Sequence, residues 1–321
     1  MSPLEAVARP SSTRPHLRTA QGGALMAMAA MSSVQLGLAL SVPLFAQLGA
    51  VGTAGLRLAW AGVLMLVLIR PRPRDFAGRD LLACALLGLV TAGMVLLFML
   101  SAARIPLGTA SALEFLGPLA VSLLRPGGGR RRWAASAAVG VVLLTEPWHG
   151  GIDPAGLGFA LGAAACWAGY ILLTQRVGDR VTGLKGLAVS LPVAGVIATL
   201  VAAPSELSHA TWPLVLVMLG LAALSTVLPF SLEFLALRRL TAGAFGTLMS
   251  LEPAIALVMG ILVLGQIPGP APAAGVILVV IAGAGATRTG GRETAAAEAG
   301  AAAADAEAVP ERDVREPALC A

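Results

Sequence analysis

Long apolar stretches follow one another along most of this chain, separated by short polar or basic breaks. Most are close to 20 residues long, the length of a helix that crosses the roughly 30 Å hydrocarbon core of a bilayer. The pattern therefore predicts an all-α integral membrane protein with ten transmembrane helices. The predicted segments cover approximately residues 24–46, 52–69, 80–101, 105–124, 133–146, 155–175, 184–203, 212–235, 241–265 and 271–287.

The composition supports a membrane protein over a soluble one. Hydrophobic residues make up 57% of the chain and charged residues only 12%, whereas a soluble domain carries about 25% charged residues. The net charge of +5 comes from arginines spread over short loops, not gathered on one helix with aromatic residues. We therefore expect a lipid bilayer, and no nucleic acid, as the partner of this surface.

One stretch of the chain occurs twice. Arg104–Leu119 returns 135 positions later as Arg239–Ala254, and each copy carries one glutamate, Glu114 or Glu252, in an apolar run. A unit of five helices reverses its direction in the membrane when it is duplicated, so we predict two inverted five-helix repeats, residues 23–147 and 154–287. Identical residues in the ungapped pairing are Arg104/Arg239, Gly108/Gly243, Leu113/Leu248, Leu116/Leu251 and Pro118/Pro253.

The basic residues predict the orientation. If the N-terminus is cytoplasmic, 20 of the 22 lysines and arginines fall on the inner side, Arg104 alone falls outside, and Arg57 lies within the second segment. Cytoplasmic loops of membrane proteins carry such an excess of positive charge. We therefore expect both termini in the cytoplasm, with residues 1–22 and 288–321 as disordered tails.

Three ionisable residues within the apolar segments are candidates for function, because each is costly in lipid unless it faces a cavity or a partner. Glu114, near the middle of the fourth segment, would bind a proton or an amine, or would instead be a buried carboxylate that stabilises packing. Glu252 precedes Pro253, whose ring removes a backbone hydrogen bond; it would belong to a gate or cap freed backbone groups. Arg57 would bind a substrate carboxylate or extend to the outer headgroups.

Four further polar or aromatic residues are predicted to line a substrate cavity. Ser33 and Gln35 lie at mid-depth in the first segment, and Trp167 and Tyr170 lie in the sixth. The alternative is ordinary hydrogen bonding between helices packed through small residues.

The sequence predicts neither an enzyme nor a bound cofactor. Its three cysteines and three histidines stand far apart, without the spacing of a metal site or a disulfide framework. The glycine- and arginine-rich run at 127–132 lacks the Lys-Ser/Thr of a phosphate-binding loop. We therefore expect no metal and no catalytic residues.

Several motifs resemble one known family. They are I-P-L-G-T-A-S-A-L-E-F-L-G-P-L-A at 105–120, W-A-G-Y-I-L-L-T-Q-R-V-G at 167–178, G-L-K-G-L-A at 183–188 and S-L-E-P-A-I-A-L-V-M-G-I-L-V-L-G-Q at 250–266. Together they are similar to EamA-type proteins of the drug/metabolite transporter superfamily, most of all to its threonine/homoserine exporter branch. The family pattern ends the ninth segment with L-G-E, where this chain has Gln266.

The resemblance implies a secondary transporter of the bacterial inner membrane that exports small metabolites, driven by the proton gradient. Amino acids such as threonine or homoserine are the expected substrates, and protons the expected coupling ion. The alternatives are efflux of a drug or signalling compound and, from another class, a non-transporting membrane protein or an intramembrane enzyme.

Overall fold

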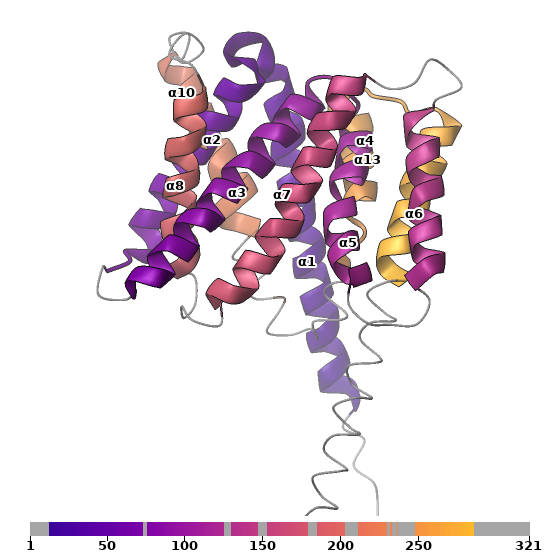
Figure 1. Cartoon of the computed structure of the whole chain (residues 1–321), viewed down its shortest axis with the longest axis horizontal. Coiled ribbons are helices and arrows are strands. Elements are labelled where there is room, and N and C mark those ends of the chain that lie inside the picture. The colour runs from indigo at the N-terminus through magenta and orange to yellow at the C-terminus, as the bar shows by residue number, and fades with distance from the viewer. Residues whose placement is uncertain are drawn as a thin grey trace, which may run out of the picture.

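The structure is a bundle of helices standing side by side (Figure 1). The computed structural model describes residues 13–72, 76–124, 130–146, 153–178, 185–202, 211–229, 232, 236 and 248–285, and every regular element in these ranges is a helix. The all-α class is thereby confirmed. The expected tail at 288–321 lies outside the described residues.

Both halves of the chain consist of helices joined by short connections. The helices of the first half are α1 (Thr13–Ser41), the 3₁₀ helix η1 (Val42–Leu44), α2 (Phe45–Ile69), α3 (Gly78–Ala102), α4 (Leu107–Glu114), α5 (Leu116–Leu124) and α6 (Arg130–Thr145). Those of the second half are α7 (Pro154–Gly178), α8 (Lys185–Val201), α10 (Trp212–Ala222), the π-helical turn η4 (Ala223–Val227), α13 (Glu252–Leu264) and a last helix, Pro270–Gly285.

Three helical stretches are long and apolar enough to cross a membrane, namely Gln21–Ile69, Gly78–Ala102 and Pro154–Thr174. Five shorter apolar helices accompany them in the described part of the chain. Leu, Ile and Val side chains are exposed on the outside of the bundle, for example Leu200 and Leu262. An exposed apolar surface of this extent is what a lipid-facing bundle requires.

The first two segments differ from their predicted bounds. α1 begins at Thr13 instead of near residue 24, so residues 13–22, expected to be a disordered tail, are helical. Its N-terminal part extends below the other helices in Figure 1. Because no proline lies between Pro15 and Pro43, nothing interrupts the helical hydrogen bonds at the N-terminal edge of the apolar run, and the helix continues beyond it.

α2 begins at Phe45 instead of near residue 52, because the turn between the first two segments lies at η1. Pro43 falls in the first positions of η1. Gly49 then takes φ 66° and ψ 167° inside α2, a backbone conformation open to glycine alone. These two irregularities divide a stretch of 49 residues that is far longer than one membrane crossing of about 20 residues.

The fourth segment is broken next to its glutamate. α4 ends at Glu114 and α5 starts at Leu116. Pro118 has no N–H to donate to the carbonyl of Glu114, four residues earlier, so the helical hydrogen-bond ladder is interrupted there.

α2 and α8 pack so closely that their backbones touch. A Cβ added to Gly62 would lie 2.8 Å from Cα of Pro192, and one added to Gly195 would lie 3.0 Å from Cα of Ala59. Gly55, earlier in α2, faces Ala198 and Ala202, later in α8, so the two helices run antiparallel. Small residues are what allow membrane helices to approach at this distance.

We expect Gly62→Val to destabilise the protein, because the new side chain meets backbone atoms of α8 that cannot move aside. Overpacking of this kind costs roughly 1–3 kcal/mol. The measurement is the free energy of unfolding in detergent, with Gly158→Val as the matched control, since no other atom lies within 4 Å of the Cβ position of Gly158. Equal stability of the two variants would show that the α2–α8 contact is not tight.

Candidate functional site

A cavity of about 170 Å³ lies at the centre of the bundle. Its wall takes residues from eight elements: α1, α2, α3, α4, α7, α8, η4 and α13. Most of the wall is apolar, with Leu38, Val95, Phe98 and Leu191 among its members. The polar and charged members are Arg57, Thr91, Glu114, Tyr170, Ser225, Thr226 and Glu252.

The cavity brings together five of the seven predicted site residues. Arg57, Glu114, Glu252, Trp167 and Tyr170 all line it, although they come from α2, α4, α13 and α7. One cation and two carboxylates therefore share a small, largely apolar space. The remaining two residues, Gln35 and Ser33, lie behind this wall.

Arg57 does not extend to the headgroups. Its residue is only 7% exposed, it lines the cavity, and its charge acts on that of Glu114. Among the residues that the structure describes, Nη1 has no hydrogen-bond partner. A buried guanidinium with an unused donor has the chemistry to bind a carboxylate.

Glu114 is held at the end of a broken helix. It is the last residue of α4, and its charge acts on both Glu252 and Arg57. The interruption caused by Pro118 places the carboxylate at the point where the fourth segment changes from α4 to α5. Of the two open interpretations, the position in a cavity favours a group that meets a ligand or a proton.

Glu252 is held by Gln35. Nε2 of Gln35 donates a hydrogen bond of 3.1 Å to Oε1 of Glu252, and both residues are buried. Glu252 is also the first residue of α13, where the positive end of the helix dipole favours a carboxylate. Gln35 thus acts as a support that links α1 to α13 behind the cavity wall.

Ser33 makes a different connection. Its hydroxyl donates a 2.5 Å hydrogen bond to the carbonyl of Leu224, in the π-helical turn η4, and Ser33 is not among the residues that line the cavity. A π turn leaves carbonyls without their usual partners and often marks a functional position. Ser33 therefore stabilises the turn that carries Ser225 and Thr226 to the cavity.

The hydroxyl groups of the wall were not predicted from the sequence. Thr91, on α3, and Ser225 and Thr226, on η4, line the cavity, but single serines and threonines are common in apolar helices. The spacing of the repeat could have identified two of these residues, Thr91 and Thr226. Thr91 and Thr226 are separated by 135 positions, the spacing of the duplicated stretch.

Trp167 is positioned by an aromatic contact. Its ring meets that of Phe115 edge to face, with centroids 6.1 Å apart and an interplanar angle of 77°. Phe115 is the residue at the break between α4 and α5. The contact therefore connects this wall of the cavity to the position of Glu114.

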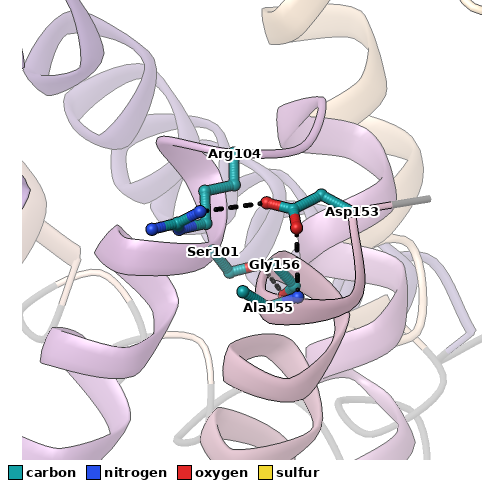
Figure 2. A network of polar contacts seen from close by, with 5 residues as sticks. All are labelled: Ser101, Arg104, Asp153, Ala155 and Gly156. Carbon is teal, nitrogen blue, oxygen red and sulfur yellow. Dashed lines mark hydrogen bonds and ion pairs between the residues drawn. The ribbon is translucent and has the colours of Figure 1, made fainter.

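A second hollow, of about 490 Å³, lies at the other end of α4 from Glu114 and is lined in part by Arg104, Glu146, Asp153 and Gln266. Figure 2 shows two of these residues, Arg104 and Asp153; Nη1 of Arg104 donates a hydrogen bond of 3.2 Å to Asp153. The hydroxyl of Ser101 donates to the carbonyl of Gly156 at 2.9 Å. These contacts hold the end of α3 against the start of α7.

Asp153 stays ionised at neutral pH in this position. The backbone N–H of Ala155, together with Arg104, holds the pKa of the Asp153 carboxyl below its usual value. Its pair with Arg104 is exposed, and exposed pairs stabilise a protein little. We therefore assign it a positioning role at the start of α7.

Gln266 has a structural partner. Its Oε1 accepts a 2.9 Å hydrogen bond from the backbone N–H of Leu107, one of the donors that the start of α4 leaves unsatisfied. An uncharged amide is sufficient for this contact. Gln266, which stands where the family pattern has the glutamate of L-G-E, can therefore connect the end of α13 to the start of α4.

The described residues contain no group of three or more His, Cys, Asp or Glu side chains that could hold a metal ion. A bundle of apolar helices around a central cavity with charged side chains is the arrangement of a small-molecule membrane transporter.

Comparison with known proteins agrees with this class. Residues 154–287 match the EamA-like transporter family. The chain is 41% identical over 252 residues to the threonine/homoserine exporter RhtA of Salmonella typhimurium (strain SL1344), covering 75% of this chain and 83% of that protein. It is 40% identical over 249 residues to RhtA of Escherichia coli (strain K12), covering 74% and 82%. The chain belongs to the EamA-like transporter family.

The chain also resembles a protein of known crystal structure. The two share 18% sequence identity with a TM-score of 0.59, over 85% of this chain and 98% of the other. At this identity the likeness shows a common fold alone.

We expect Gln35→Met to lower stability, since it removes the donor to Glu252 while keeping the side chain's length. Leaving a buried carboxylate with one partner fewer costs roughly 1–3 kcal/mol. Thermal unfolding in detergent measures the loss, and Gln47→Met, at an exposed position of α2, is the matched control. A Gln35→Met protein as stable as the control would show that the link between α1 and α13 is weak.

Proposed function

We propose that this protein is a secondary transporter of the bacterial inner membrane that exports small amino acids, in exchange for protons, with threonine and homoserine as the first candidates. The observation that carries the proposal is the joint presence of Arg57, Glu114 and Glu252 in the wall of one cavity. An amino acid is a zwitterion. A guanidinium binds its carboxylate, and carboxylates bind its ammonium group.

The apolar part of the wall supports the same class of substrate. Small-molecule sites are largely apolar, with a few polar groups that fix the orientation of the ligand. Both RhtA relatives are named threonine/homoserine exporters, and their substrates are small zwitterions. A volume of about 170 Å³ suits a ligand of this size better than a large drug.

We further propose ten membrane spans in two inverted repeats, residues 23–147 and 154–287. Reciprocal contacts support a two-fold relation between the halves. Gly62 meets Pro192 and Leu191, while Gly195 meets Ala59 and Leu58, so each contact maps onto the other when the helices are exchanged. A self-complementary contact of this kind is the property of a two-fold axis.

A second reciprocal contact lies between α6 and the last helix. A Cβ added to Gly140 would lie 3.0 Å from the carbonyl oxygen of Gly275, and one added to Gly275 would lie 2.7 Å from that of Gly140. These glycines are separated by 135 positions, the spacing of the duplicated stretch. α6 and the last helix would be the fifth and tenth spans.

The proposed mechanism alternates access to the cavity by movement of one repeat against the other. Glu114 would carry the coupling proton. With both carboxylates ionised and Arg57 charged, the cavity has a net charge of −1, which attracts either a proton or the ammonium group of a substrate. Competition between the two for Glu114 would link export of the substrate to entry of a proton.

Glu114→Gln tests this mechanism, because it keeps the shape of the side chain and removes its titration. In inverted membrane vesicles with an acidic lumen, the wild type should accumulate labelled threonine or homoserine, about tenfold for each pH unit if one proton is exchanged. The variant should lose this dependence on the gradient, with accumulation close to one. Glu146→Gln, outside the cavity, is the matched control.

Two outcomes would contradict parts of the proposal separately. A wild type that moves neither threonine nor homoserine would remove these substrates. A Glu114→Gln variant with full gradient dependence would make Glu114 a structural carboxylate and shift the coupling role to Glu252.

Both termini are proposed to be cytoplasmic, which places Ile267 outside and Ala77 inside. Both residues are exposed, so single cysteines there, in a chain whose own cysteines are replaced by alanine, should react readily. An impermeant maleimide should label position 267 in intact cells and position 77 only after the membrane is disrupted. The reverse pattern would invert the topology.

A further inference from the structure

We propose that the hydroxyl groups of Thr91 and Ser225 bind the side-chain hydroxyl of the substrate, so that the cavity selects hydroxylated amino acids over apolar ones of the same shape. The inference rests on the proposed function, because it concerns amino acids bound in the same cavity. It assigns a specificity role to two residues on different elements of the wall, α3 and η4.

Thr91 offers an acceptor to the cavity. It lines the wall and is only 5% exposed, and its Oγ1 donates a 2.7 Å hydrogen bond to the carbonyl of Leu87. A hydroxyl has one proton to donate and two lone pairs. Because the proton is committed to the helix, the lone pairs that remain can only accept.

Ser225 is arranged in the same way. Its Oγ donates a 2.7 Å hydrogen bond to the carbonyl of Leu221, and the residue lines the cavity. A Cβ added to Gly37 would lie 2.8 Å from Cβ of Ser225, so η4 is pressed against α1. Together with the hydrogen bond from Ser33 to Leu224, this contact fixes the position of the Ser225 hydroxyl.

The two hydroxyl acceptors add a binding group for the substrate's side chain to the charged residues that would bind its carboxylate and ammonium groups. Arg57 provides donors for the carboxylate of an amino acid, and Glu114 and Glu252 provide acceptors for its ammonium group. A side chain that carries a hydroxyl brings one more donor, which Thr91 or Ser225 can accept. Valine, with a methyl in place of the threonine hydroxyl, would leave a desolvated acceptor without a partner.

Two pairs of amino acids isolate this effect, because their members have nearly the same shape. Threonine differs from valine, and homoserine from norvaline, by a hydroxyl in place of a methyl. A site that hydrogen-bonds a substrate hydroxyl discriminates against the analogue that lacks it. For one uncharged hydrogen bond we expect roughly a 3- to 10-fold difference.

The test is competition against labelled homoserine transport in inverted vesicles that contain the full-length protein. With the wild type, threonine should inhibit at roughly 3- to 10-fold lower concentration than valine, and norvaline should be weaker than unlabelled homoserine. Thr91→Val should reduce the threonine/valine ratio towards one, and Ser225→Ala should reduce either this ratio or the homoserine/norvaline ratio. Thr91→Ser keeps the hydroxyl and should keep the discrimination.

Matched controls separate recognition from helix stability. Thr199 and Ser41 make the same 2.7 Å bond to the carbonyl four residues earlier but do not line the cavity. Thr199→Val and Ser41→Ala should therefore leave both ratios unchanged. Transport of labelled homoserine by the wild type tests the proposed function. The inhibition ratios test the further inference, so the two can fail separately.

Two results would overturn the inference while the proposed function stands. One is a wild type that transports homoserine but is inhibited equally by threonine and valine, an outcome that needs no variant to fold. Another is an unchanged ratio in both Thr91→Val and Ser225→Ala. In either case these hydroxyls serve only their own helices, as is common for serine and threonine in membrane spans.

Discussion

The cavity depends on how closely α2 approaches α8. At Gly62 and Gly195 the backbone of each helix touches the other, and a side chain at either position would meet main-chain atoms of its neighbour. Because lipid tails are as apolar as leucine, close packing rather than exclusion from water must hold membrane helices together. This contact sets the distance between the two helices, and thereby the place of Arg57 on α2 and of Leu191 on α8 in the cavity wall.

The charged groups inside the apolar interior of the bundle have two kinds of environment. Glu252 lies at the start of α13 and accepts a hydrogen bond from Gln35. Arg57 and Glu114 both line the cavity. An ionisable residue within a membrane span is expensive, so residues arranged in this way point to a pathway or a binding site. The residues behind the wall, Gln35 and Ser33, position those that form it.

The charged residues that line the cavity could be selected from the sequence, because such residues stand out in apolar segments. Arg57, Glu114 and Glu252 needed no structure to be noticed. The sequence did not distinguish Thr91 and Ser225 from the other serines and threonines of the apolar segments. A threonine or serine in a helix usually bonds its own backbone, and only the packing of the helices decides whether it also faces a cavity. The start of α1 and the turn at η1 were misplaced because hydropathy marks the lipid-facing length of a helix, and its ends depend on proline and glycine.

In the proposed repeat, the contacts between helices follow the two-fold relation, but the positions of the charged residues do not. Residues that make reciprocal contacts, such as Gly62 and Gly195, 133 positions apart, or Gly140 and Gly275, 135 positions apart, would occupy corresponding places in the two proposed repeats. The carboxylates do not, because the pairing at 135 positions sets Glu114 opposite Met249 and Glu252 opposite Gly117. A zwitterion has two different ends, and a cavity with equivalent charges in both halves would bind it in two opposite orientations. Divergence of the charged residues between two proposed repeats would give the substrate one orientation, and so would give its side chain one place in the wall.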